Sequence, residues 1–215
     1  MAKIFDADAL PRRLIRTGLG VVVVACVVLA QVPMSVAAGT HSRDGGHSDG
    51  GGRSNAGPTS ALVLAARDGD IEKVQALLDK GSSVNATDGD GRTALMHVST
   101  SGNTEIAQLL LKHGAQPQST DKSGNSALHY AAGRGNLDIV RLLLDRNARP
   151  DQQNRDGETA LMLAAGGNNT AIVHALLEHG ADPRKTDYTG RDALDWAQDH
   201  KQRAVAEILR SSGQP

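Results

Sequence analysis

Hydrophobic positions recur along this chain of 215 residues at a fixed spacing of 33 residues. One register holds Leu62, Leu95, Leu128, Leu161 and Leu194, and another holds Leu77, Leu110, Leu143, Leu176 and Leu209. Glycines hold a third register at Gly91, Gly124, Gly157 and Gly190. A sustained period of this length is typical of an array of small units, each of which buries its apolar side against its neighbours. The pattern therefore predicts a stacked solenoid.

Each unit combines a short apolar stretch with a longer one, and both stretches carry helix boundary signals. Thr93, Ser126 and Thr159 stand where a side-chain oxygen can cap the first helix of a unit. The left-handed position that ends a helix is filled by Gly69, Gly102, Gly135 and Asn168 after the first helix, and by Gly81, Gly114, Asn147 and Gly180 after the second. Asn is the residue that best tolerates this conformation after Gly. We therefore expect two helices in each unit.

The two ends of the array depart from the pattern in a polar direction. Arg210 stands in the last unit where earlier units have leucine, and Lys73 stands in the first unit where the second has Ile106. A terminal unit has no neighbour to cover its outer side, so these changes predict that the outer two units serve as caps.

At these residues the sequence resembles the ankyrin-repeat family, whose pattern runs G-x-T-P-L-H-x-A-A and continues to an I-V-x-x-L-L stretch. The chain reads "GRTALMHVS", "GNSALHYAA" and "GETALMLAA", followed by "IAQLLLKHGA", "IVRLLLDRNA" and "IVHALLEHGA". Alanine replaces the family's proline in every copy, and only His129 keeps its histidine. The resemblance implies an all-α solenoid of about five helix-turn-helix repeats with short β-hairpin turns, over residues 59–88, 89–121, 122–154, 155–187 and 188–215.

The same resemblance implies a non-catalytic module that binds a protein partner of unknown identity through turn tips and the concave side of the first helices. Carried over by register, the candidate contact residues are Asp90, Arg92, Lys122, Asn125, Tyr130, Arg134, Arg155, Glu158, Tyr188, Arg191 and Trp196. Tyr, Trp and Arg are the residue types that most often carry binding energy. The alternative is that these are ordinary solvated tips and half-buried helix residues.

Composition and motifs favour binding over catalysis. The formal net charge is -1, which gives no strong attraction to nucleic acid or acidic membranes. Cys26 is the single cysteine, so the rest of the chain has no disulfide and no thiol nucleophile. No G-x-S-x-G, Walker or H-E-x-x-H motif occurs. We therefore expect no enzyme activity, no cofactor and no metal centre, and we expect a monomer.

Three histidines of the repeats, His174, His179 and His97, are interpreted as structural. The segment "HALLEH" (174–179) is one residue too long for the inverted zinc motif, and we expect its histidines to face solvent near a helix end. His97 occupies a first-helix position that other copies fill with Tyr130, Leu163 and Trp196. Partial burial on the concave side is expected there, in preference to a catalytic role.

The N-terminal residues have the parts of a secretory signal peptide. Arg12, Arg13 and Arg16 precede an apolar run of 13 residues (18–30), and "SVAAG" follows as a cleavage site. A signal peptide over 1–37 places the mature chain in the periplasm or outside the cell, in line with the exported bacterial ankyrin-repeat proteins that the sequence resembles, some of which are linked to peroxide defence. An uncleaved anchor is disfavoured because about 20 residues are needed to span a bilayer. A lipoprotein site at Cys26 is the third alternative.

Residues 38–58 are rich in Gly and Ser and are expected to form a flexible tether. His41, Asp44, His47 and Asp49 lie within this segment. They leave open an alternative function, in which the tether sequesters a metal or another small ligand.

Overall fold

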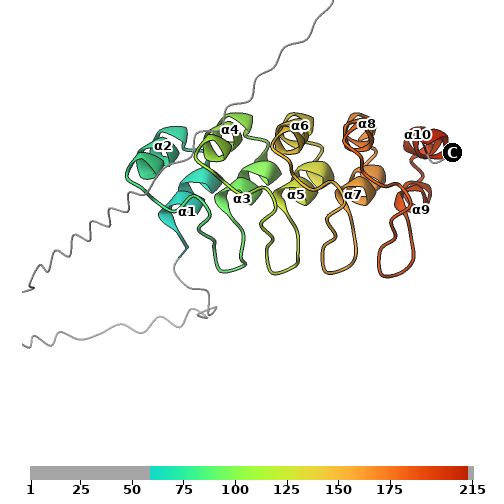
Figure 1. Ribbon diagram of the computed structural model, residues 1–215, viewed down its shortest axis with the longest axis horizontal. Helices are drawn as coiled ribbons and strands as arrows, with labels where there is room; N and C mark the ends of the chain where they lie inside the picture. Colours follow the sequence, from blue (N-terminus) through green and yellow to red (C-terminus); the bar gives the residue numbers. More distant parts are fainter. Residues whose placement is uncertain (1–58, 213–215) are drawn as a thin grey trace, which may run out of the picture. The chain divides into compact units, whose positions relative to one another are not determined.

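The computed structural model describes residues 59–212, which form ten α-helices in five antiparallel pairs and contain no strand (Figure 1). The helices are α1 (Ala61–Asp68), α2 (Ile71–Asp79), α3 (Ala94–Ser101), α4 (Thr104–Lys112), α5 (Ala127–Arg134), α6 (Leu137–Asp145), α7 (Ala160–Gly166), α8 (Thr170–Glu178), α9 (Ala193–Asp199) and α10 (Arg203–Ser212). This arrangement confirms the predicted all-α solenoid. The predicted signal peptide (1–37) and tether (38–58) lie outside the described residues, and the exact repeat boundaries stay a prediction.

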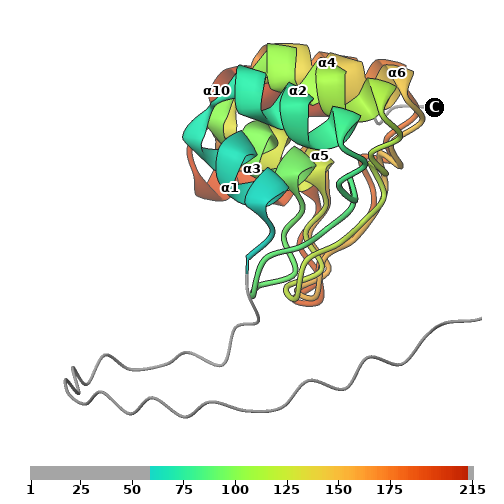
Figure 2. The ribbon, with the colours of Figure 1, turned by 90° about the vertical axis from the view of Figure 1, so that its left-hand side faces the viewer.

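The helices form two layers. The first helices of the pairs (α1, α3, α5, α7, α9) stack in one layer, and the second helices (α2, α4, α6, α8, α10) stack in the other. The connections between pairs extend away from both layers as hairpins, so that the array has an L-shaped cross-section (Figure 2). The hairpins are tight turns, with one isolated antiparallel bridge between Thr87 and Thr93.

The core is a thin layer that follows the two leucine registers. Leu110, Leu143 and Leu176 are fully buried between the layers, whereas Leu77 and Leu194, which belong to the end pairs, are only half-buried. The first-helix alanines that replace the family's proline are also buried, at Ala94, Ala127, Ala160 and Ala193. A small side chain at this position lets neighbouring helices approach closely. Bulk in this core therefore comes from aliphatic side chains.

Most helix ends follow the predicted backbone rules, but the Ser126 side chain makes no cap hydrogen bond, and its Oγ lies 2.8 Å from His129 Nδ1. Thr93 Oγ1 accepts a hydrogen bond from the backbone N–H of Met96 at 3.3 Å, and Thr159 does the same for Met162 at 3.4 Å. Asn147 and Asn168 have φ values of 59° and 58°, the left-handed conformation that the sequence predicts for them. Lys201 has φ 59° at the position equivalent to Asn168, which the sequence did not indicate.

Both predicted caps are polar at the expected positions. Lys73 and Arg210 are exposed on the first and the last pair. Within the described residues, none of the helices is both long and apolar enough to span a bilayer.

Candidate protein-interaction surface

Each hairpin is built around one side chain at a position that repeats every 33 residues. These side chains are Asp88, Asp121, Asn154 and Asp187. In the first hairpin, Asp88 Oδ1 accepts from the backbone N–H groups of Asp90 and Arg92, both at 2.9 Å. The other three hairpins repeat the same two bonds at 2.9–3.0 Å. Sequence reasoning missed these four residues, although their spacing was visible.

The second carboxylate oxygen of each hairpin aspartate contacts a side chain on the helix that directly follows the hairpin. Asp88 Oδ2 lies 2.8 Å from His97 Nε2. Asp121 Oδ2 accepts from the Tyr130 hydroxyl, and Asp187 Oδ2 accepts from Trp196 Nε1 at 3.0 Å. His97 is thus half-buried and serves as a structural partner of the hairpin.

In the third hairpin, both the hairpin residue and the helix residue that faces it are changed. Leu163 replaces the donor on the first helix, and Asn154 replaces the aspartate. The Asn154 amide Nδ2 instead donates to Glu158 Oε2 at 2.9 Å and to Asn125 Oδ1 at 3.0 Å. A carboxylate is present only where the helix supplies a donor.

The charges of these buried groups are fixed by their partners. Burial alone would raise the pKa of Asp187, but hydrogen bonds from Thr189, Arg191 and Trp196 hold that pKa well below its ordinary value. The pKa of Asp88 is also lowered, because the His97 and backbone hydrogen bonds outweigh its burial. Burial and the bond to Asp121 raise the pKa of Tyr130 to about 12. Asp88 and Asp187 are therefore ionised acceptors, and Tyr130 stays a donor.

Two of the predicted arginines stack on two of the predicted aromatic residues. Arg92 Cζ lies 5.0 Å from the centroid of the Tyr130 ring, and Arg191 Cζ lies 5.0 Å from that of Trp196. Arg191 also pairs with Asp187 at 3.0 Å. Cation–π stacking and the ion pairs hold these side chains in place. Which arginine meets which ring was not evident from the sequence.

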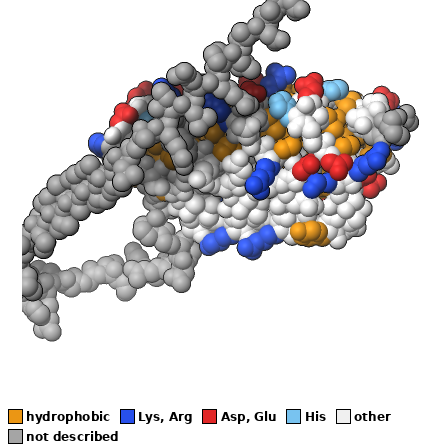
Figure 3. Space-filling model, in the orientation of Figure 1, with side chains coloured by type: hydrophobic (Ala, Val, Ile, Leu, Met, Phe, Trp, Pro, Cys, Tyr) orange, Lys and Arg blue, Asp and Glu red, His pale blue; other side chains and the backbone are white. Residues whose placement is uncertain are grey.

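Backbone hydrogen bonds between neighbours join the hairpin tips into one edge. Lys122 N donates to Asp90 O, Arg155 N to Ser123 O, and Tyr188 N to Asp156 O, each at 3.0 Å. Lys122, Arg155 and Tyr188 are equivalent positions along this edge and lie outside the two stacks. Figure 3 shows basic and hydrophobic side chains along it. Tyr188 is 73% exposed and is the one large hydrophobic residue classed as exposed among residues 59–212.

The structure brings four of the predicted residues together in a shallow depression of about 250 Å³ between α5 and α7. Asn125, Tyr130, Arg134 and Glu158 line it, with His129, Gly133 and Leu163. We call the eleven predicted contact residues, which lie on the hairpin tips and on α5 and α9, the hairpin face. Asp90, Lys122, Arg134, Arg155 and Tyr188 are exposed, and the other members are half-buried.

His129 lies beneath this face and is only 2% exposed. Its Nδ1 accepts from the Ser126 backbone N–H at 3.2 Å, and its Nε2 lies 3.1 Å from the Glu158 carbonyl oxygen. Since a carbonyl only accepts, Nε2 carries the proton and the imidazole is neutral. Burial lowers the pKa of His129, in keeping with this state.

The other chemical candidates do not form a site within the described residues. His174, Glu178 and His179 are exposed, and His179 Nδ1 donates to the Ala175 carbonyl at 2.8 Å near the end of α8. Residues 59–212 contain no cluster of three side chains suited to hold a metal. The tether residues His41, Asp44, His47 and Asp49 lie outside the described part of the chain.

A family model described as ankyrin repeats (3 copies) matches residues 62–154 and 146–215, which together make up well over half of the chain. The chain belongs to the ankyrin-repeat family. A comparison with curated proteins found no match. Ankyrin repeats generally act as protein–protein interaction modules and are typically non-catalytic. The hairpin face lies on the tips and first helices of these ankyrin repeats.

Proposed function

We propose that the chain is an exported, non-catalytic module whose ankyrin hairpin face binds a protein partner. The observation that carries the proposal is the combination, on one face, of exposed Tyr188 with the stacked pairs Arg92–Tyr130 and Arg191–Trp196. These residue types dominate interface energetics. Because the two stacked pairs are already ordered by stacking and ion pairing, binding loses less of their side-chain entropy.

Capture of the partner tests this proposal. The chain is immobilised and exposed to a periplasmic extract, and retained proteins are cross-linked and identified by mass spectrometry. We expect a defined partner that the double variant Arg155→Ala/Tyr188→Ala fails to retain. Glu178→Ala, an exposed change on α8 away from the hairpins, is the matched control. Equal retention by the double variant and the control would refute the hairpin face as the binding surface.

Export is supported by the arginines, the apolar run and the small-residue site within residues 1–37. The proposed location is the periplasm or the exterior of the cell. N-terminal sequencing of the exported protein should find a start near Ala38 or Gly39. A start before Val32 would contradict cleavage at this site. A role in peroxide defence is part of this proposal only through the resemblance to exported bacterial members of the family. Normal peroxide resistance in a deletion strain would refute that role.

The alternative function is sequestration of a metal or small ligand by the tether, and it rests on the spacing of His41, Asp44, His47 and Asp49. Metal titration by calorimetry, with and without residues 38–58, separates it from partner binding. Saturable binding that disappears with the tether would favour the alternative.

A further inference from the structure

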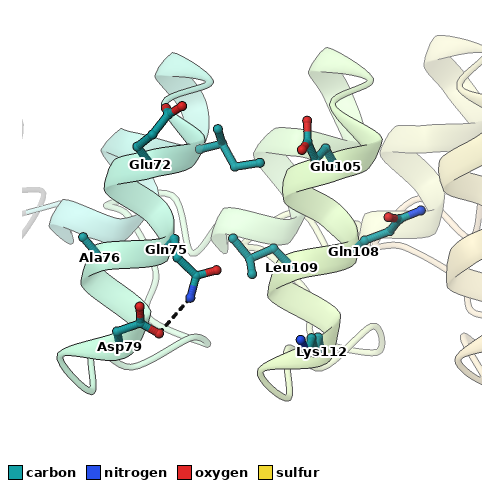
Figure 4. A pocket seen from close by; sticks show the side chains of 9 residues that line it. Glu72, Gln75, Ala76, Asp79, Glu105, Gln108, Leu109 and Lys112 are labelled. Atoms are coloured by element: carbon teal, nitrogen blue, oxygen red, sulfur yellow. Dashed lines mark hydrogen bonds between the residues drawn. The ribbon is translucent and has the colours of Figure 1, made fainter.

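A hollow of about 630 Å³ on the repeat array lies away from the hairpin face. It runs between α2 and α4 on the outer layer of second helices (Figure 4). Ile71, Ala76 and Leu109 form its apolar part, and Ile71 and Leu109 are only half-buried. We call this hollow the outer groove.

The groove draws apolar side chains from two neighbouring repeats. Leu109 of α4 points toward α2 (Figure 4), and Leu142 is its equivalent in α6. Ile71 of α2 is equivalent to Thr104 of α4, so the α2 side of the groove carries an apolar side chain where the next repeat has a polar one.

The rim of the groove is acidic. Glu72 and Glu105 lie in the first turns of α2 and α4, at the same end of the groove (Figure 4). Neither carboxylate forms an ion pair with another described residue. Asp79 accepts from Gln75 at 2.7 Å at the other end, and Lys112 is the one cation among the lining residues. Three carboxylates and one ammonium group give the lining a net charge of -2.

We propose that the outer groove is a second docking site, which takes a basic amphipathic segment of a protein partner. An apolar side chain of that segment lies between Ile71 and Leu109, and Lys or Arg side chains lie beside Glu72 and Glu105. Amphipathic helices commonly bind apolar grooves in this way, and charge complementarity excludes acidic segments. Because the groove lies on the second helices, opposite the hairpin tips (Figure 1), the chain can hold partners at both surfaces at once.

Two synthetic peptides test the proposal on the full chain. Both are amphipathic helix formers with leucines at the same positions, and their polar faces carry Lys in one peptide and Glu in the other. Fluorescence anisotropy should show saturable binding of the Lys peptide that weakens as salt is added, and no saturation with the Glu peptide. Absence of saturation with the Lys peptide, or equal binding of both, would overturn the proposal.

Variants then place the site. Ile71→Thr replaces an apolar side chain of the groove with the residue type that α4 carries at the equivalent position, Thr104, and it should weaken binding of the Lys peptide severalfold with an unchanged circular dichroism spectrum. Glu105→Lys should have a similar effect through charge. Glu178→Lys, on the same layer but outside the groove, and Arg155→Ala/Tyr188→Ala, on the hairpin face, should leave the affinity unchanged. Wild-type affinity in Ile71→Thr and Glu105→Lys, or an equal loss in Glu178→Lys, contradicts a site in the groove and leaves the hairpin-face proposal unaffected.

Discussion

At the scale of single residues, the hairpins show how one buried side chain links a turn to the helix that follows it. An aspartate occupies this position where His97, Tyr130 or Trp196 faces it, and Asn154 occupies it where Leu163 does. A buried carboxylate without enough donors is costly, and an amide supplies donors of its own. We therefore expect hairpin stability to depend on the match between the hairpin residue and the helix residue that faces it.

Asn154→Asp should lower the free energy of unfolding by about 1–3 kcal/mol, because its two amide donations are lost and a carboxylate is placed beside Glu158. Leu163→Tyr in the same chain supplies the hydroxyl that Tyr130 gives to Asp121, and it should restore part of the loss. Urea unfolding of the two single variants and the double variant measures the coupling. Additive effects of the two changes would contradict the pairing.

The neutral imidazole of His129 predicts a pH dependence. Its pKa is lowered from the ordinary value of 6.5, so the unfolded chain takes up a proton before the folded chain does. The free energy of unfolding should therefore fall as the pH drops below about 6.5 and level off below the folded pKa. The lowered pKa values of Asp88 and Asp187 act in a separate window, since their stabilisation is lost only as the pH falls below the ordinary value of 3.8.

His129→Met provides the test, because Met96 and Met162 occupy the equivalent positions and their Sδ atoms accept from Thr93 N and Thr159 N. The variant should lose the dependence below pH 6.5 that arises from His129. Urea unfolding at pH 7.5 and pH 5.5 measures it. The same change in unfolding free energy between these two pH values in both proteins would show that His129 is not its source.

At the scale of the helix, burial differs among the leucines of one register. Leu143 is fully buried in α6, and Leu77 in α2 is half-buried. Leu209 in the last pair is only 3% exposed, so the expectation that it is less enclosed because it has one neighbouring pair does not hold.

Leu143→Ala should therefore cost about 2–5 kcal/mol of unfolding free energy, the usual range for emptying a buried leucine site. Leu77→Ala should cost clearly less, because its side chain already has contact with solvent. Chemical unfolding of the two variants decides the matter. Equal losses would contradict the difference in packing between Leu143 and Leu77.

Much of the helical scaffold could be predicted from the sequence, because spacing and helix-boundary residues are local properties. Asn147 and Asn168 were assigned a left-handed conformation since few other residues adopt it. The stacking of Arg92 on Tyr130 could not be predicted in this way, because it depends on how the hairpin folds back onto the helix. The outer groove was missed for a related reason: Ile71 and Leu109 belong to different repeats and come together only when α2 and α4 stack.

At the scale of the whole molecule, the repeat array separates stability from recognition. The core lies between the helix layers, while the tips project from them and carry exposed side chains (Figure 2). Each repeat contacts only its neighbours, so changes at the tips leave the core intact. The hairpin face is therefore free to vary with the partner.

The central claim is that the hairpin face binds the partner, and one calorimetric measurement tests it most directly. The partner identified by cross-linking is titrated into the chain and into Arg155→Ala/Tyr188→Ala. Truncating a dominant interface residue costs about 2 kcal/mol or more, so the double variant should bind well over tenfold more weakly. Its melting temperature should barely change, because surface substitutions usually stay within about 0.5 kcal/mol. Wild-type affinity in the double variant, together with loss of binding when residues 39–58 are deleted, would place the functional surface on the tether instead.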